Sequence, residues 1–289
     1  MLIRCRLNTC SKILAGRNYR SKAAMVDWLQ VVILALIQGV TEFLPVSSSA
    51  HLLLPSKLLG WPDQGLAFDI SVHAGTLCAV VFYFRQTLFG LARALMPGSG
   101  LDRSECWTLI IATLPVLLAG FLLKELIAGE ARTVVVITTT TLLFGVLLGC
   151  ADWVSRRGQR RHTAIRARDA FLIGCAQTLA LIPGTSRSGI TITAALFLGY
   201  HPTVAARFSF LLSVPVIAGA VVVMLMSDHV SLPAHAGAYY VIAFLVSGCF
   251  AYATISAFIY WVSKIGLMPF VVYRLLLGFA LWIGIVEGL

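Results

Sequence analysis

Charged residues are scarce in this chain. Lys, Arg, Asp and Glu make up 12% of its 289 residues, whereas 59% of the residues are hydrophobic. A typical soluble domain is about a quarter charged and about half apolar. The mean hydropathy of +0.90 agrees with this excess of apolar residues. A soluble domain would need more charge to cover its surface, so we predict that a lipid bilayer surrounds most of the chain.

Three further features are missing. The seven cysteines include no CxxC pair, and we assign them no metal or disulfide role. The net charge of +10 comes from basic residues between the apolar tracts, without interleaved aromatic residues, so nucleic acid is not an expected partner. Residues 1–24 are basic but lack the continuous apolar segment of about 7–15 residues that a cleaved signal peptide contains.

The basic N-terminal extension, residues 1–24, has two explanations that remain open. It is either a functional basic arm or the result of a misassigned start codon, because Met25 directly precedes the amphipathic start of the first apolar segment. On either explanation, residues 25–289 form a single membrane domain.

Six apolar tracts are long enough to cross a membrane, since a spanning helix needs about 20 residues. These tracts are 66–84, 106–127, 132–152, 204–227, 238–262 and 267–286. Two further apolar segments, about 28–59 and 170–200, are interrupted by Pro, Gly and Ser at Pro45–Ser49 and Pro183–Gly189. We predict that each of these two segments is a re-entrant hairpin of broken helices.

The two interrupted segments resemble each other. Pro45–Ser49 is followed by Leu59-Gly60-Trp61-Pro62, and Pro183–Ser188 is followed at nearly the same distance by Leu198-Gly199-Tyr200-His201-Pro202. One hairpin and three spans per unit is an odd number of crossings, so the second unit would be inverted relative to the first. Chance similarity of apolar helices is the alternative. The predicted fold is an all-α integral membrane protein with about six transmembrane helices and two re-entrant hairpins in an inverted repeat of units 25–152 and 169–289.

The loop 156–168 is rich in arginine, and the positive-inside rule therefore places it in the cytoplasm. Counting spans from there places the loop 93–105 inside and the loop 228–237, which lacks Lys and Arg, outside. The first hairpin then enters from outside and the second from inside, so their tips would approach each other. We predict that the site opens to the periplasm.

The first hairpin contains ionisable and hydroxyl side chains in an apolar setting. Gln38 and Glu42 are four residues apart, so on a helix they share a face and would hold a Mg²⁺ or Ca²⁺ ion together with substrate oxygens. A solvated Glu42 at the membrane interface is the alternative. Ser48 follows the break at a predicted helix N-terminus, which favours phosphate, and His51 is a helical neighbour able to move its proton.

The second hairpin places Arg187 among glycines and hydroxyls without an acidic neighbour in sequence. A guanidinium matches phosphate oxygens in a bidentate manner, so a phosphate is one predicted partner. An ion pair with Glu42 is the other. The remaining hydroxyls that we expect to contact substrate belong to Ser47, Ser49, Ser186, Ser188 and Thr191.

Two motifs carry a resemblance to a known family. The stretch from Gln38 to His51, QGVTEFLPVSSSAH, resembles the first signature of the undecaprenyl-diphosphate phosphatases, also called bacitracin-resistance proteins. Pro183–Gly189 resembles the second signature, and Pro269–Arg274 extends the similarity into the last span. The resemblance runs from about Met25 to the C-terminus.

The resemblance implies dephosphorylation of undecaprenyl diphosphate in the bacterial inner membrane, which supports cell wall synthesis and bacitracin resistance. It implies a divalent cation, essential roles for Glu42, His51 and Arg187, and Ser48 as the nucleophile. Many members have Glu where this chain has Gln38, which weakens the predicted metal site. A transporter or flippase for an anionic lipid or solute is the alternative function, and the sequence leaves the oligomeric state and the phosphoserine intermediate undetermined.

Overall fold

The computed structural model describes residues 28–123, 133–157, 163–226 and 237–287. Within these ranges the secondary structure is helical, and no β-strand occurs. The basic N-terminal extension, residues 1–24, lies outside the described residues. The all-α prediction is confirmed for the part of the chain that is described.

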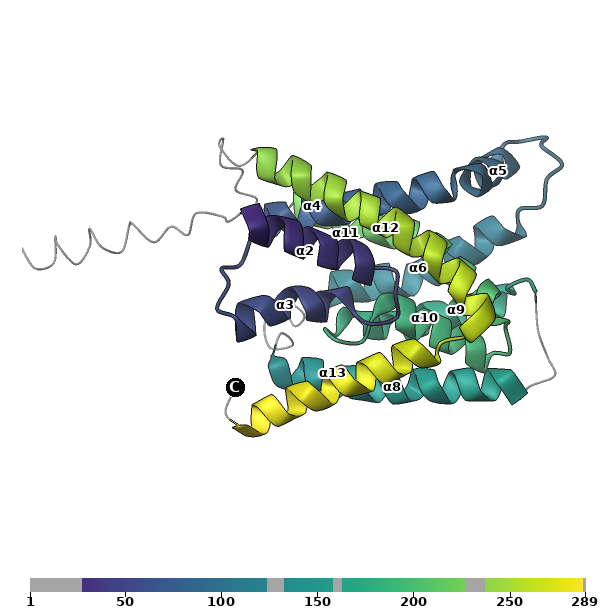
Figure 1. Ribbon diagram of the computed structural model, residues 1–289. Coiled ribbons are helices and arrows are strands. Elements are labelled where there is room, and N and C mark those ends of the chain that lie inside the picture. Colours follow the sequence, from purple (N-terminus) through teal and green to yellow (C-terminus); the bar gives the residue numbers. More distant parts are fainter. Residues whose placement is uncertain (1–27, 124–132, 158–162, 227–236, 288–289) are drawn as a thin grey trace, which may run out of the picture.

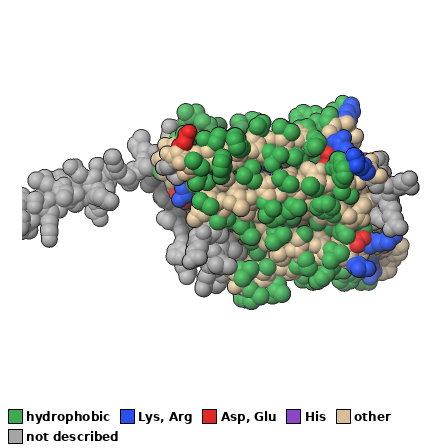
Figure 2. All heavy atoms as spheres, turned by 90° about the horizontal axis from the view of Figure 1, so that it is seen from below, with side chains coloured by type: hydrophobic (Ala, Val, Ile, Leu, Met, Phe, Trp, Pro, Cys, Tyr) green, Lys and Arg blue, Asp and Glu red, His purple; other side chains and the backbone are tan. Residues whose placement is uncertain are grey.

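Six helices are long and apolar enough to cross a membrane, as predicted. They are α4 Leu66–Tyr83, α6 Ser104–Leu122, α8 Val134–Arg157, α11 Pro202–Leu225, α12 Gly237–Ile265 and α13 Met268–Glu287. The face shown in Figure 2 is covered largely by hydrophobic side chains, and Lys and Arg gather mainly at one end. Such a surface is unfavourable in water but suits a hydrocarbon environment. The chain is therefore a multi-pass membrane protein.

Shorter helices form the two interrupted segments. The first contains α2 Trp28–Thr41 and α3 Ser48–Leu58, and the second contains α9 Ala167–Gln177, the 3₁₀ turn η1 Thr178–Leu181 and α10 Arg187–Phe197. The longest of them, α2, has 14 residues, or about 21 Å at 1.5 Å per residue. This is less than the roughly 30 Å of a hydrocarbon core. Their re-entrant placement in a membrane stays a prediction.

The two breaks share an unusual backbone conformation. Ser47 and Ser186 precede α3 and α10, and their φ angles are 74° and 73°. Positive φ is uncommon for a residue with a side chain, and among the described non-glycine residues only these two adopt it. The same strained conformation therefore begins the second half-helix of each hairpin.

The helices of the two halves of the chain pair in corresponding ways, while the inverted repeat itself stays a prediction. Helix α12 packs along α2 and α4, α6 packs against α9 and α11, and α8 pairs with α13 (Figure 1). Close approach is possible because small residues lie at the crossings. A Cβ atom added at Gly39 of α2 would lie 2.5 Å from the carbonyl oxygen of Ser247 on α12. A Cβ atom added at Gly174 of α9 would likewise lie 2.5 Å from the carbonyl oxygen of Ala112 on α6. Both hairpins are thus held by a long helix from the opposite half.

Among the helices of the described residues, one of more than two turns was not predicted. Helix α5, Arg85–Leu95, directly follows α4 (Figure 1), and only its last residues fall within the predicted loop 93–105. The guanidinium of Arg85 lies 4.5 Å from the ring centre of Phe82, and that of Arg93 lies 5.7 Å from the ring centre of Phe89. The alternation of basic and apolar side chains suits a helix at a polar boundary. A search for long apolar tracts cannot find such a helix.

Candidate active site

The turns of the two hairpins contact each other inside the protein. The Ser188 hydroxyl donates a hydrogen bond to the carbonyl oxygen of Leu44 at 2.8 Å, which joins the second turn to the first. Arg274 Nη1 donates to the carbonyl oxygens of Pro45 at 3.3 Å and Thr185 at 2.9 Å. The contact between the tips that the topology suggested is therefore present.

Arg274 is the side chain that holds this junction together. It lies on α13, it is 0% exposed, and all of its hydrogen-bond acceptors among the described residues are backbone carbonyls. These carbonyls belong to Pro45, Thr140, Thr141, Gly184 and Thr185, at 2.9 to 3.3 Å. One guanidinium thus ties both turns to α8. In the sequence, Arg274 is marked only as the end of the motif Pro269–Arg274, although a charge in an apolar span is a signal by itself.

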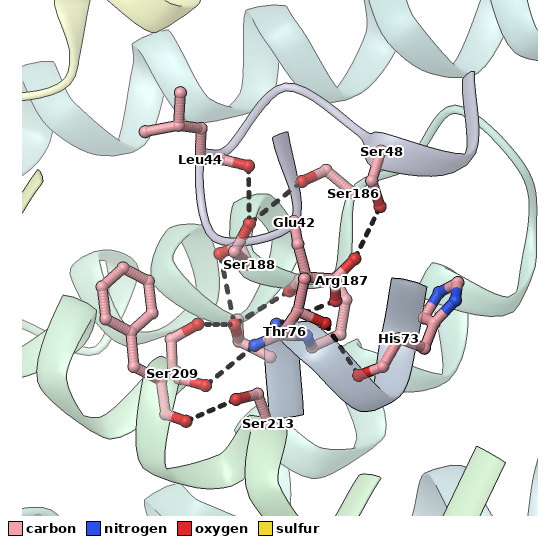
Figure 3. A network of polar contacts seen from close by, with 12 residues as sticks. Glu42, Leu44, Ser48, His73, Thr76, Ser186, Arg187, Ser188, Ser209 and Ser213 are labelled. Atoms are coloured by element: carbon pink, nitrogen blue, oxygen red, sulfur yellow. Dashed lines mark hydrogen bonds and ion pairs between the residues drawn. The ribbon is translucent and has the colours of Figure 1, made fainter. Parts of the chain in front are cut away.

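Glu42 is the centre of a polar cluster at the end of α2 (Figure 3). Its Oε2 accepts hydrogen bonds from the Ser48 hydroxyl at 2.8 Å and from Gln38 Nε2 at 3.0 Å. Its Oε1 lies 3.4 Å from Arg187 Nη2, and the Glu42 side chain is 8% exposed. The predicted shared face of Gln38 and Glu42 is confirmed, and the carboxylate connects the serine to the arginine.

Arg187 is the first residue of α10 and reaches across to the first hairpin. Besides the ion pair with Glu42, its Nη1 donates to the carbonyl oxygen of Ser209 at 2.9 Å. A guanidinium has five N–H donors, so these two contacts do not exhaust it. The ion pair that we considered as an alternative to phosphate binding is present, and it does not prevent the guanidinium from binding an anion.

Within the described residues, His51 and Ser48 form hydrogen bonds with different partners. Its Nδ1 is 2.7 Å from the carbonyl oxygen of Ser47, which can only accept, so Nδ1 carries the proton. Its Nε2 then accepts from the hydroxyl of Tyr273 on α13 at 2.6 Å, and the two rings stack with centres 5.7 Å apart. Helical spacing predicted a contact between Ser48 and His51, but the rotamer of His51 turns its ring toward α13. The acceptor beside the Ser48 hydroxyl is Glu42.

Most of the other predicted hydroxyls serve the local structure. Ser186 caps α10 by accepting from the Gly189 amide at 3.1 Å, and Thr191 contacts the Ser209 hydroxyl at 2.8 Å. Ser47, Ser186, Ser188 and Thr191 are all buried, with exposed fractions of 7% or less. Ser49 differs, because it is exposed and lines a cavity. Ser48 and Ser49 are thus the predicted hydroxyls best placed to meet a substrate.

A cavity of about 240 Å³ lies beside Ser48. The first hairpin contributes Gln38, Ser48 and Ser49 to its wall, and α4 contributes Asp69 and His73. The rest of its wall includes Trp61, Asp63 and Gln64 from the α3–α4 connection and Ala180, Leu181 and Pro183 from the second hairpin. Sequence reasoning missed Asp69 and His73, although both are ionisable residues in a predicted span.

Comparison with known proteins identifies the family of this chain. The family model described as "Bacitracin resistance protein BacA" matches residues 31–280, which include the cluster and the cavity wall. The chain belongs to the BacA family. Relatives from Chromohalobacter salexigens, Teredinibacter turnerae and Hahella chejuensis are 51%, 50% and 49% identical and cover 89%, 90% and 88% of this chain. The alignments include 98%, 100% and 96% of the relatives, each named undecaprenyl-diphosphatase.

Proposed function

We propose that this BacA family member hydrolyses undecaprenyl diphosphate to undecaprenyl phosphate and inorganic phosphate. The names of relatives that are about half identical over nearly the whole chain support the substrate. The observation that carries the proposal is the cluster of Ser48, Glu42 and Arg187, which combines a hydroxyl, a base and an anion-binding group and reaches the cavity through Ser48. The reaction regenerates the carrier lipid for cell wall synthesis and thereby gives resistance to bacitracin, in agreement with the family description.

In the proposed first step, Ser48 attacks the terminal phosphorus. Glu42 takes the hydroxyl proton through the existing 2.8 Å hydrogen bond while the Ser48 oxygen forms a bond to phosphorus. The bond between that phosphorus and the bridging oxygen breaks, and undecaprenyl phosphate leaves with the electron pair. Arg187 binds the non-bridging oxygens, because positioning and charge stabilisation provide most of the catalysis in phosphoryl transfer.

In the second step, water attacks the phosphoserine and inorganic phosphate leaves. Glu42 returns its proton to the Ser48 oxygen as the bond to phosphorus breaks. His51 remains a proposed catalytic residue, but its hydrogen bond to Tyr273 would have to open before it could reach the reacting atoms. In an alternative route, Glu42 activates a water molecule that attacks the phosphorus directly, and Ser48 only orients the substrate.

We also propose that a divalent cation, Mg²⁺ or Ca²⁺, accompanies the diphosphate. Gln38 fits the role of a ligand, because its Oε1 is buried and has no hydrogen-bond partner among the described residues. Glu42 fits less well than predicted, since Arg187 and two hydrogen bonds already balance its charge. When bound, the cation would neutralise phosphate oxygens. Gln38 and Glu42 alone do not complete a cation site.

The first test is release of inorganic phosphate from undecaprenyl diphosphate by the purified protein. The wild type should release phosphate, and Ser48→Ala should abolish release if Ser48 is the nucleophile. Measurable hydrolysis by Ser48→Ala would favour attack by water. Ser56→Ala, in the wall of the same cavity, is the matched control and should retain wild-type turnover. A well-folded wild type that binds the lipid without releasing phosphate would contradict the proposed function and favour a transporter or flippase.

We further propose that the protein lies in the bacterial inner membrane with the cavity open to the periplasm. The arginine-rich loop 156–168 supports this orientation through the positive-inside rule. Gln64 lies in the cavity wall, whereas Ser263 lies near the end of α12, close to Asp152 and Arg156 of α8. These two positions should therefore face opposite sides of the membrane.

Cysteine labelling tests this orientation. In a background without the seven native cysteines, Gln64→Cys should react with a membrane-impermeant maleimide in intact spheroplasts. Ser263→Cys should react only after the membrane is opened. Undecaprenyl diphosphate should also slow the labelling of Gln64→Cys. The reverse labelling pattern would place the cavity on the cytoplasmic side and would leave the proposed reaction unaffected.

A further inference from the structure

The charge of the cavity does not match a diphosphate. Its described lining residues include the carboxylates of Asp63 and Asp69 but no Lys or Arg. A diphosphate that enters beside Ser48 would meet negative groups on the α4 side, and Arg187 already shares its charge with Glu42. Like charges at short range repel each other. A cation between the diphosphate and α4 would remove this conflict.

Helix α4 presents two groups suited to such a cation. Asp69 and His73 are four residues apart, on one face of the helix, and both line the cavity. His73 Nδ1 lies 2.7 Å from the carbonyl oxygen of Asp69 and therefore carries the proton of the neutral ring. Nε2 then holds the lone pair that can coordinate a metal. A second hydrogen bond that orients the ring in this way is typical of metal-binding histidines.

Gln38 adds a third ligand from α2. Its Nε2 must face Glu42, because a carboxylate can only accept the 3.0 Å hydrogen bond between them. This orientation directs Oε1 away from Glu42. Gln38 is 0% exposed and lines the cavity, and within the described part of the chain Oε1 has no hydrogen-bond partner. A buried amide oxygen without a donor is costly unless something else satisfies it.

We propose that the cation of this protein binds at Asp69, His73 and the Oε1 atom of Gln38, on the wall of the cavity facing α4. The inference rests on the proposed function, since the diphosphate supplies the remaining oxygen ligands. The carboxylate and the amide oxygen suit both Mg²⁺ and Mn²⁺, and Mn²⁺ also accepts an imidazole nitrogen. The cation and Arg187 then bind the diphosphate from different sides, and Glu42 stays available to accept the proton of Ser48.

Pulsed electron paramagnetic resonance with Mn²⁺ tests this site without measuring turnover. The sample is tag-free protein in detergent with Mn²⁺ and farnesyl methylenediphosphonate, in which a CH₂ group replaces the bridging oxygen and prevents hydrolysis. The wild type should show the nitrogen modulation of a coordinated imidazole. The modulation should disappear in His73→Gln and persist in His51→Gln, the control histidine in the same part of the protein. Asp69→Asn should weaken Mn²⁺ binding by at least about 10-fold.

Two results would overturn the proposed site. One is a wild-type spectrum without imidazole modulation, which would mean that Mn²⁺ binds elsewhere or does not bind. This result does not depend on the folding of any variant. The other is modulation that survives His73→Gln. If the same preparation still released phosphate from undecaprenyl diphosphate, only the cation site would be wrong. Absence of phosphate release would instead contradict the proposed function.

Discussion

Arg187→Lys should lose most of the turnover even though it keeps the positive charge. The guanidinium binds Ser209 and Glu42 from two nitrogens and still has donors for phosphate oxygens, whereas an ammonium group has only three donors and no planar fork. We expect kcat to fall about 100-fold in Arg187→Lys and about 1000-fold or more in Arg187→Ala. Phosphate release at saturating substrate measures both values.

The matched control for this prediction is Arg207→Lys. Arg207 also contacts a carboxylate through both terminal nitrogens, in this case Glu105, but the Arg207 side chain is 43% exposed. Partly exposed ion pairs contribute little to stability, so this variant should keep turnover within about twofold of the wild type. The thermal melting temperature should show that each variant is folded. Wild-type turnover by a folded Arg187→Lys would show that bidentate phosphate binding is not needed.

The sequence could predict the features that depend on length and local spacing. The hydrocarbon thickness fixes the length of a spanning helix, so the six tracts were found to within a few residues. Gln38 and Glu42 share a face because helical geometry alone determines that relation. The duplicated motifs likewise predicted two matching turns, whose serines share one backbone conformation.

Contacts across the fold were less predictable, because they depend on rotamers and on packing between distant segments. His51 could have turned toward Ser48, and its ring instead stacks on Tyr273, which lies 222 positions away. His73 required knowledge that α4 borders the same cavity as Ser48. The partners of Arg274 are backbone carbonyls, which leave no signal in the sequence.

The repeated turns explain how one backbone geometry provides two different chemical groups. Ser48 and Arg187 are the first residues of α3 and α10, and each follows a serine with positive φ. At a helix N-terminus, the free amides and the helix dipole favour an anion. The first turn places a hydroxyl at this position and the second places a guanidinium. Bringing the two turns together therefore assembles a nucleophile and an anion-binding group from opposite halves of the chain.

Arg274→Met should destabilise the protein by disrupting this assembly. Methionine approximates the length of the arginine stem but donates no hydrogen bond, so the carbonyls of both turns and of α8 would lose a buried donor. A buried carbonyl oxygen that is left without its donor typically costs about 1–3 kcal/mol. We expect a clear fall in melting temperature in detergent and loss of phosphate release, because Ser48 and Arg187 would no longer be held together.

Two further variants show whether the loss comes from the missing donors. Arg274→Lys keeps the charge and up to three donors, so its melting temperature should lie between those of the wild type and Arg274→Met. Arg93→Met removes an exposed arginine that contacts the Phe89 ring, and it should change the melting temperature little. A melting temperature for Arg274→Met equal to that of the wild type would contradict a structural role for these hydrogen bonds. If such a variant were also inactive, Arg274 would have to act on the substrate rather than on the two turns.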